Sequence, residues 1–204
     1  MEHCNAKQSD ILHAAIAEFA KCGVMGTTME QIAKSAQVSK RTLYKHYANK
    51  DELFDEVVEL QLNTIRRLKD FPYHPNMPLF DQLKLLAKEV IKLTQNEDYL
   101  TLSRIVIIES MRSKEAADRV NVKFTDCEKG LTGWFSYAEK AGALGELTAK
   151  TAGTMFYGSI KQLIYWEQAI KWQPPLPQEE IELLIDQVCH VFSFGLSPKT
   201  LNKI

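Results

Sequence analysis

The most distinctive chemistry in the sequence lies in VSKRTLYKHY, residues 38–47, where basic and hydroxyl side chains recur at helical spacing. If Ser39 caps a helix, Leu43 and Tyr47 lie four residues apart on its buried face. The opposite face then carries Lys40, Arg41, Tyr44 and Lys45. Arginine and lysine donate hydrogen bonds to guanine in the major groove of B-DNA, and threonine or tyrosine can touch a thymine methyl group or a phosphate. The spacing therefore predicts a helix that reads DNA.

A local excess of positive charge surrounds this stretch. The formal net charge of the chain is -1, but residues 1–50 carry seven Lys or Arg against four Asp or Glu, and residues 51–204 carry 18 against 22. The excess is densest at residues 27–50, where five basic residues face one acid, Glu30. A polyanion is therefore expected to meet the chain there. Because a basic helix face is also common on solvated surfaces, charge alone leaves both interpretations open.

Two helices are predicted before this stretch. Apolar spacing predicts a first helix that opens near Ser9 and ends at Gly23, a residue that readily takes the left-handed conformation found after helices. Thr27 and Thr28 are each followed three residues later by Glu or Gln, so either threonine can form the capping box of a second helix. The start of that helix is thus predicted to within one residue.

A short turn then leads to the basic helix. Only Gln37 and Val38 separate the second helix from Ser39, and Asn49, followed three residues later by Glu, predicts the start of a fourth helix. Two short capped helices, a two-residue turn and a basic second helix are the helix-turn-helix layout of proteins that read the major groove. This combination favours DNA recognition over an ordinary solvated face.

The rest of the chain also predicts helices, because apolar residues recur at spacings of three and four without alternation of period two. A long helix from Asp51 is ended by the proline-rich FPYHPNMP. Further helices are predicted at about 78–96, 98–112, 114–141, 148–172 and 178–196, with QPPLP separating the last two. The fold class is therefore all-α.

The segment TTMEQIAKSAQVSKRTLYKHYANKDELF, residues 27–54, resembles the DNA-binding signature of the tetracycline-repressor-like (TetR) family. The matching residues are Thr28, Ile32, Ala33, Ala36, Val38, Ser39, Tyr44, His46, Lys50 and Leu53. The C-terminal part, with LSRIVIIES and GELT, is similar to AefR-type regulatory domains of that family. Three residues depart from the pattern: Gln37 stands where Gly is common, Tyr47 replaces Phe, and Arg41 occupies a position often filled by a small residue.

The resemblance implies a three-helix helix-turn-helix domain at residues 1–50 and a helical bundle for ligand binding and dimerisation at residues 51–204. Base edges or nearby phosphates would be met by Lys40, Arg41, Thr42, Tyr44 and Lys45, next to the capping residue Ser39. The sugar-phosphate backbone would be held by Thr27, Thr28, His46, Tyr47 and Lys50. The expected function is a ligand-responsive repressor that binds a palindromic operator. Activation instead of repression stays open, because the protein sequence does not show where an operator lies.

One reading helix touches one half-site, so a homodimer is expected. The resemblance implies an interface formed by the last two helices. Its candidate residues are Phe156, Ile160, Leu163, Ile170, Ile181, Leu184, Ile185, Val188, Val191 and Phe192. The competing interpretation is that these stripes face the core of their own domain.

A small, mostly apolar effector is expected to bind between helices of the C-terminal part. Candidate pocket residues are Ile107, Ile108, Met111, Phe124, Trp134, Tyr137, Tyr165 and Trp166. Arg104, Glu109 and Arg112 are candidates for its polar end. Core packing for the apolar residues, and solvated surface for the charged ones, are the alternatives.

Other classes of function have weaker support. Cys4, Cys22, Cys127 and Cys189 form no C-x-x-C pair, which disfavours a zinc site and a disulfide framework, although a redox sensor acting through one thiol stays an alternative. An enzyme is disfavoured because no Glu-x-x-His pair, glycine-rich phosphate loop or G-x-S-x-G motif occurs. No cofactor or metal is predicted. Without a signal peptide or membrane span in the sequence, a cytoplasmic location is expected.

Overall fold

The computed structural model describes residues 6–196, and within this range it describes no side chain at Lys69, residues 126–131 or Leu196. Every regular element in the described range is a helix, which confirms the all-α fold class. The chain forms two compact units: unit 1 is Met1–Asn63 with Thr101–Phe124, and unit 2 is Thr64–Leu100 with Thr125–Ile204.

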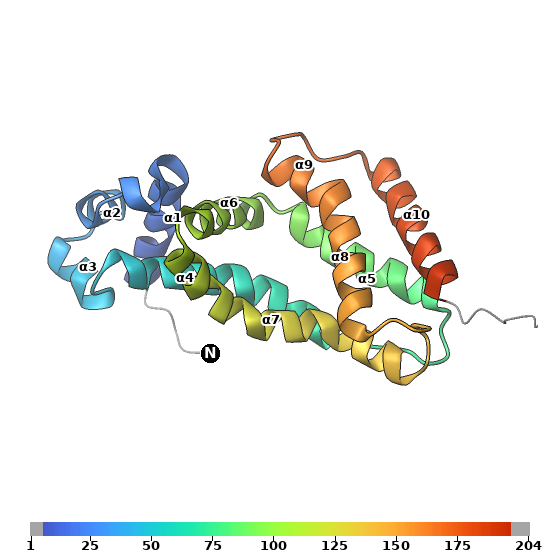
Figure 1. Ribbon diagram of the computed structural model, residues 1–204. Coiled ribbons are helices and arrows are strands. Elements are labelled where there is room, and N and C mark those ends of the chain that lie inside the picture. The colour runs from blue at the N-terminus through green and yellow to red at the C-terminus, as the bar shows by residue number, and fades with distance from the viewer. Residues whose placement is uncertain (1–5, 197–204) are drawn as a thin grey trace, which may run out of the picture. The chain divides into compact units, whose positions relative to one another are not determined.

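Unit 1 begins with four consecutive helices (Figure 1): α1 (Ala6–Gly26), α2 (Met29–Ser35), α3 (Lys40–His46) and α4 (Lys50–Arg66). α1 starts earlier than predicted and its assigned span runs past Gly23. Gly23 itself is not helical, with φ 71° and ψ 163°, so the predicted helix end is a kink. The core of this region includes the fully buried Ile11, Ile32 and Leu43, one from each of the first three helices.

Polar contacts within unit 1 link α4 to parts of α6 (Glu97–Arg112) and α7 (Lys114–Lys140). The buried Gln61 amide donates to Ser103 Oγ at 2.8 Å. The Arg119 guanidinium lies 3.1 Å from Asp51 Oδ2 and 3.0 Å from Asp55 Oδ1. These contacts tie Ser103 of α6 and the N-terminal part of α7 to α4.

Unit 2 contains a 3-10 turn η1 (Arg67–Asp70), then α5 (Leu79–Thr94), α8 (Ala149–Ile160), η2 (Lys161–Tyr165), α9 (Trp166–Ala169) and α10 (Gln178–Leu196). α10 packs against α5 and α8. The core of the unit is rich in aromatic rings: Phe135 contacts Trp134 edge-on with centroids 5.0 Å apart, and Phe156 contacts Phe192 in the same way at 5.4 Å. Such edge-to-face pairs stabilise beyond the area they bury.

The predicted helix ranges beyond residue 77 agree with the structure, with one difference in kind. The segment predicted as one helix at 148–172 consists of α8, a π-helical stretch at η2 and the short α9. A π-helix adds a residue to the turn, which shifts the buried face; Ile164 and Tyr165 are buried there.

Candidate DNA-binding interface

The cap and the buried face of α3 are as predicted. Ser39 Oγ accepts a hydrogen bond from Thr42 N at 3.1 Å, which satisfies one of the free amides in the first turn. Leu43 is fully buried and Tyr47, at the C-terminal cap, is 4% exposed. The outer face is therefore free to carry polar side chains, and Tyr44 is 48% exposed there.

The turn before α3 is a Schellman motif with a glutamine in the position that favours glycine. Val38 N donates to Ala33 O at 3.0 Å and Gln37 N donates to Lys34 O at 3.1 Å. Gln37 has φ 54°, in the left-handed region. A side chain with a Cβ is strained in this conformation, so the departure of Gln37 from the family pattern carries a conformational cost.

The two threonines before α2 have different roles. Thr28 forms the capping box: its Oγ1 accepts from Gln31 N at 3.2 Å, and its own N donates to Gln31 Oε1 at 2.7 Å. Thr27 is 1% exposed, and its hydroxyl lies 2.8 Å from Gly23 O and 3.1 Å from Glu18 O. Thr27 therefore holds the end of α1 and presents no hydroxyl to a phosphate in this conformation.

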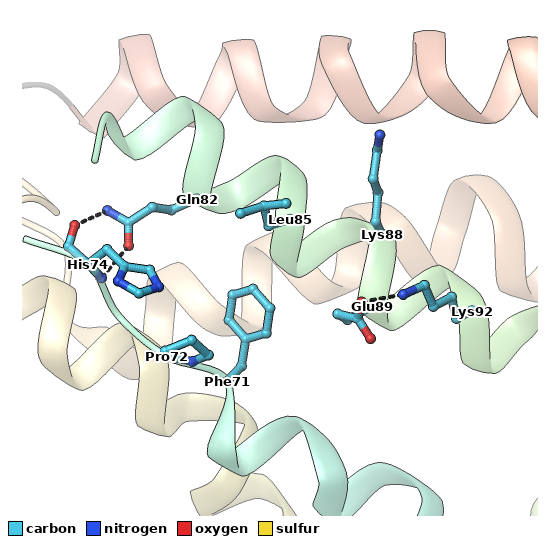
Figure 2. Close-up of a pocket in the computed structure, with 8 residues that line it drawn as sticks. All are labelled: Phe71, Pro72, His74, Gln82, Leu85, Lys88, Glu89 and Lys92. Atoms are coloured by element: carbon cyan, nitrogen blue, oxygen red, sulfur yellow. Dashed lines mark hydrogen bonds and ion pairs between the residues drawn. The ribbon is translucent and has the colours of Figure 1, made fainter. Parts of the chain in front are cut away.

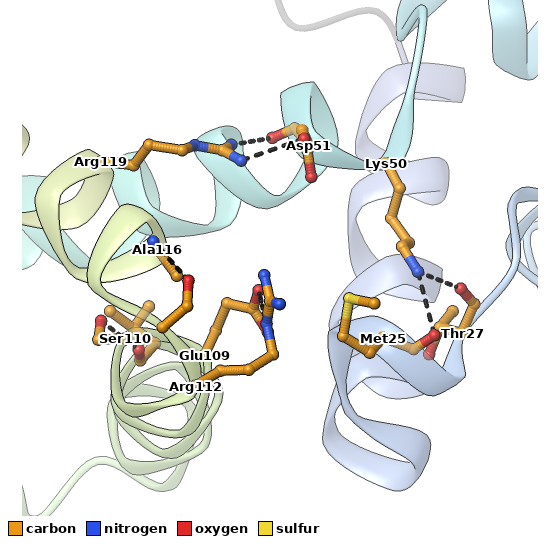
Figure 3. Close-up of polar contacts among 11 residues, drawn as sticks. Met25, Thr27, Lys50, Asp51, Glu109, Ser110, Arg112, Ala116 and Arg119 are labelled. Atoms are coloured by element: carbon orange, nitrogen blue, oxygen red, sulfur yellow. Dashed lines mark hydrogen bonds and ion pairs between the residues drawn. The ribbon is translucent and has the colours of Figure 1, made fainter.

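Lys50, at the first position of α4, is likewise engaged inside the protein. Its ammonium donates to Thr27 O at 2.8 Å and to Met25 O at 3.3 Å (Figure 3). Asn49 Oδ1 accepts from Glu52 N at 2.9 Å, which caps α4 as the spacing predicted. Lys50 thus links the start of α4 to the connection between α1 and α2.

An ion pair joins the first turns of α2 and α3. Lys40 Nζ lies 2.8 Å from Glu30 Oε1, with 63% and 52% of the two side chains exposed. The hydrogen bond from Lys40, with the backbone N–H of Glu30 as a smaller cause, lowers the pKa of the Glu30 carboxyl. The Glu30 carboxyl therefore stays ionised at neutral pH.

The DNA-contact residues predicted from the sequence fall into three groups. The exposed ones are Thr28, Ser39, Lys40, Arg41, Tyr44 and Lys45; the half-buried ones are Thr42, His46 and Lys50; and the buried ones are Thr27 and Tyr47. The exposed group lies on α3 and at the caps of α2 and α3. Sequence spacing did not identify Glu30 as a partner of Lys40, because the two residues meet only once the turn is formed.

The candidate effector residues are divided between the two units. Ile107, Ile108, Met111 and Phe124 belong to unit 1, and Trp134, Tyr137, Tyr165 and Trp166 belong to unit 2. Within unit 2, Tyr165 lies 4.8 Å from Trp166 and 6.3 Å from Tyr99, measured between ring centroids. Trp134 is buried, and its indole N–H finds no acceptor among the described residues. Tyr137 is exposed.

Each unit contains cavities lined by its own residues alone. In unit 1, Ile108 and Met111 line a cavity of about 340 Å³ together with residues 22–26. Its polar side is formed by Glu109, which is buried and accepts from Arg112 Nε at 2.9 Å (Figure 3). Burial of Glu109 removes the alternative that this residue is solvated surface.

The second cavity, in unit 2, has a volume of about 290 Å³ (Figure 2) and was not anticipated from the sequence. Its lining residues are Phe71, Pro72, His74, Gln82, Leu85, Lys88, Glu89 and Lys92. The buried Gln82 amide forms three hydrogen bonds to the backbone of His74 and Met77. The sequence predicted a proline-rich helix break followed by a helix at about 78–96, and the polar Gln82 at a buried position of that helix was the available signal for the cavity.

The candidate dimer residues also divide by burial. Phe156, Ile160, Ile181, Ile185, Val188 and Phe192 are buried in the core of unit 2, whereas Leu163, Ile170 and Val191 are exposed and Leu184 is half-buried. Other apolar side chains of these helices are exposed, among them Met155 on α8 and Phe194 on α10. A groove of about 290 Å³ is lined by Leu147, Met155, Ser159, Val191, Phe192 and Gly195. Spacing alone could not separate the two faces.

Two of the four cysteines are described. Cys22 is exposed and Cys189 is buried, and burial raises the pKa of the Cys189 thiol to about 12. A thiol with such a pKa is unreactive at neutral pH. Cys4 lies outside the described residues, as does the side chain of Cys127.

In the part of the chain with described side chains, no three His, Cys, Asp or Glu residues cluster as a metal site requires. No helix there is long and apolar enough to cross a membrane.

Comparisons with known proteins agree with this geometry. A family model for bacterial regulatory proteins of the tetR family matches residues 11–57, and a model for the C-terminal domain of AefR-like transcriptional repressors matches residues 81–194. The HTH-type transcriptional regulator YhgD of Bacillus subtilis (strain 168) is 28% identical over 185 residues, which cover 86% of this chain and 91% of that protein. The probable acrEF/envCD operon repressor of Escherichia coli (strain K12) is 39% identical over 61 residues, 30% of this chain and 27% of that protein.

Similarity to solved structures extends over nearly the whole chain. A TetR family transcriptional regulator from Pseudomonas syringae pv. tomato DC3000 superposes with a TM-score of 0.79 at 28% identity, covering 94% of this chain and 96% of the other. These relatives are transcriptional regulators, not enzymes. With a capped helix-turn-helix at its N-terminal end and an AefR-like match over more than half its length, the chain belongs to the TetR family and is a helix-turn-helix transcriptional regulator of the repressor type.

Proposed function

We propose that this protein binds a palindromic DNA operator as a homodimer and is released from it by a small, mostly apolar effector. The observation that carries the proposal is the outer face of α3, where Lys40, Arg41, Tyr44 and Lys45 are exposed while Leu43 and Tyr47 anchor the helix from behind. An α-helix fits the major groove, and the residues at its N-terminal end meet base edges. α3 is thus the proposed reading helix.

Within this interface, base reading and backbone contacts are assigned to different residues. Arg41 and Lys45 are exposed cations of α3, and Arg41 is the proposed base reader because its planar guanidinium can donate two parallel hydrogen bonds to guanine. Thr28 and Ser39, at the caps of α2 and α3, are proposed to approach phosphates. Thr27, Tyr47 and Lys50 are proposed to act indirectly, because their side chains hold the domain together.

Dimerisation is proposed through the exposed apolar side chains of α8 and α10. Val191 is 68% exposed and Met155 52% exposed, and both line the groove on this face. Leaving such apolar surface in water is unfavourable, and a two-fold axis would bury the same patch on both chains. The residues of the earlier prediction that fit this face are Leu163, Leu184 and Val191. Two reading helices would then lie about one helical turn of DNA apart, roughly 34 Å.

The effector is proposed to bind among the aromatic side chains of unit 2. Tyr99, Tyr165 and Trp166 lie together there, and the buried Trp134 N–H is a free donor among the described residues. An apolar pocket with few polar groups is the usual site for small molecules in helical bundles. α4, α6 and α7 each contain residues of both units, so they are the proposed route from effector to reading helix. A coupling of about 1–3 kcal/mol would weaken operator binding roughly 5- to 150-fold.

Selection of bound fragments from a random duplex DNA pool tests the proposal directly. The purified protein, without effector, is expected to recover a two-fold symmetric site, and sedimentation is expected to show a dimer on it. Because the chromosome is the proposed target, the protein is proposed to act in the cytoplasm. Recovery of only random sequences at low salt, by folded protein, would contradict operator binding.

The role of Arg41 can then be measured on the selected site. Arg41→Ala is expected to cost about 1–3 kcal/mol on the operator and to relax the preference at one base position. Arg67→Ala, which removes the same charge from unit 2, is the matched control and should leave the affinities for the operator and for random duplex unchanged. Equal losses on operator and random duplex for Arg41→Ala would contradict its role in reading bases.

A further inference from the structure

Glu30 is the one acid in residues 27–50, and it contacts a residue of the reading helix. Its carboxylate lies 2.8 Å from the Lys40 ammonium, across the turn that joins α2 to α3. Lys40 is the first residue of α3, so its side chain starts at the end of the helix that enters the groove in helix-turn-helix proteins. The pair therefore lies within the proposed DNA interface.

The pair restricts what Lys40 can do. A lysine without a partner is a flexible cation that can bind any nearby phosphate. An ammonium that is hydrogen bonded to a carboxylate is held in place, and its charge is partly neutralised. An ammonium has three N–H donors, so one bond to Glu30 leaves two for other acceptors. Guanine O6 and N7 are such acceptors in the major groove. A phosphate near Glu30 would in contrast be repelled by the carboxylate.

We propose that Glu30 is a positioning residue for sequence specificity: it holds Lys40 toward base edges and denies this cation to phosphates of random DNA. The proposal rests on the proposed function and adds to it a determinant outside the reading helix. On the operator, Lys40 keeps its bond to Glu30 and donates its remaining N–H groups to a base. On random DNA no base acceptor is in register, and Lys40 contributes little.

Glu30→Gln tests the proposal, because glutamine keeps the size of the side chain and removes its charge. Binding to random duplex at low salt is expected to tighten about twofold to fivefold, the range associated with an exposed ion pair. The slope of log affinity against log salt on random duplex should steepen by about 0.9, the value for one added phosphate contact. Operator binding should stay within about twofold of wild type, so the ratio of operator to random affinity falls by about the same factor as random binding rises.

Two further variants separate this role from simpler ones. Glu89→Gln removes the acid of an exposed ion pair with Lys92 in unit 2. This control should change neither the affinity for the operator nor the affinity for random duplex. In a Lys40→Met background, Glu30→Gln should no longer tighten random binding, because no cation is released. Thermal unfolding of each variant shows whether the domain stays folded.

The outcomes distinguish a positioning role of Glu30 from a purely repelling charge and from a structural brace. Equal tightening on operator and random DNA, or equal tightening with and without Lys40, would mean that Glu30 acts only as a repelling charge and would overturn the inference. Weaker binding to both DNAs together with lower stability would make the pair a structural brace and would also overturn it. A wild-type protein with no operator preference would instead refute the proposed function itself, and the inference with it.

Discussion

Replacement of Gln37 by glycine should stabilise the helix-turn-helix. Gln37 is exposed, has φ 54°, and occupies the left-handed position of the Schellman motif that ends α2. Both hydrogen bonds of the motif are made by backbone groups, Gln37 N to Lys34 O and Val38 N to Ala33 O, so they survive the substitution. Gln37→Gly therefore changes the conformational energy of the turn and removes no backbone contact.

The magnitude follows from two opposing effects. A residue with a Cβ costs roughly 1–2 kcal/mol in the left-handed region, and glycine avoids this cost. Glycine has more freedom in the unfolded chain, which lowers the free energy of unfolding by about 0.4–1 kcal/mol. The difference is a net stabilisation of about 0.5–1 kcal/mol. For a chain of this length each kcal/mol raises Tm by roughly 2–4 °C, so the expected rise is about 1–4 °C.

Thermal unfolding followed by far-ultraviolet circular dichroism measures the shift, and hydrogen exchange at residues 27–50 shows whether it arises in this region. Gln37→Ala is the matched control, since alanine loses the long side chain but keeps the Cβ and the strain. The reasoning predicts a rise for glycine and no rise for alanine. A fall in Tm for Gln37→Gly, or the same rise for both variants, would refute it.

Further variants test internal roles. Thr27→Val, which keeps the shape but removes the hydroxyl that two carbonyls of α1 accept from, should cost about 1–2 kcal/mol in urea unfolding and leave the operator-to-random affinity ratio unchanged. Lys50→Met should lower Tm and change the salt slope of DNA binding by less than the 0.9 or so of one phosphate contact, because its ammonium is bonded to carbonyls within the protein. Burial raises the pKa of the Cys189 thiol above the unfolded value of about 8.5, so the neutral thiol stabilises the folded protein at neutral pH and this contribution is lost as pH rises toward about 12. Cys189→Ala should therefore flatten the fall in the free energy of unfolding at alkaline pH. In variants that retain a single cysteine, Cys22 should react with a thiol reagent at neutral pH and Cys189 should not.

The parts of the fold governed by local sequence could be predicted. Ser39 and Thr28 cap their helices because each hydroxyl needs only amides two or three residues ahead. Gln37 was identified as a departure from the family pattern, which commonly has glycine there, and φ at that position is positive. Gly23, predicted as the end of the first helix, has a positive φ and lies at a kink, although a helical turn continues beyond it.

Contacts between distant residues could not be predicted in this way. The family resemblance assigned Lys50 to the sugar-phosphate backbone, but here the carbonyls of Thr27 and Met25 lie within reach of its ammonium. Met155 and Phe156 are adjacent on α8, and the sequence allows either residue to belong to an apolar stripe. Only packing shows that Phe156 is buried and Met155 is exposed. Two-sided apolar helices therefore leave the choice between core and interface open at the level of sequence.

The caps also bear on how this protein can hold DNA. The first turns of α2, α3 and α4 each have an amide bonded by a side chain of the chain itself, at Gln31, Thr42 and Glu52. Helix N-termini attract phosphates through such amides, so part of that capacity is already used. Lys50 is engaged by carbonyls and Lys40 by Glu30. With Arg41 proposed to read a base, phosphate binding must then rely mainly on other exposed cations such as Lys45. Because few cations carry the nonspecific affinity, one carboxylate at Glu30 can shift the balance between operator and random DNA.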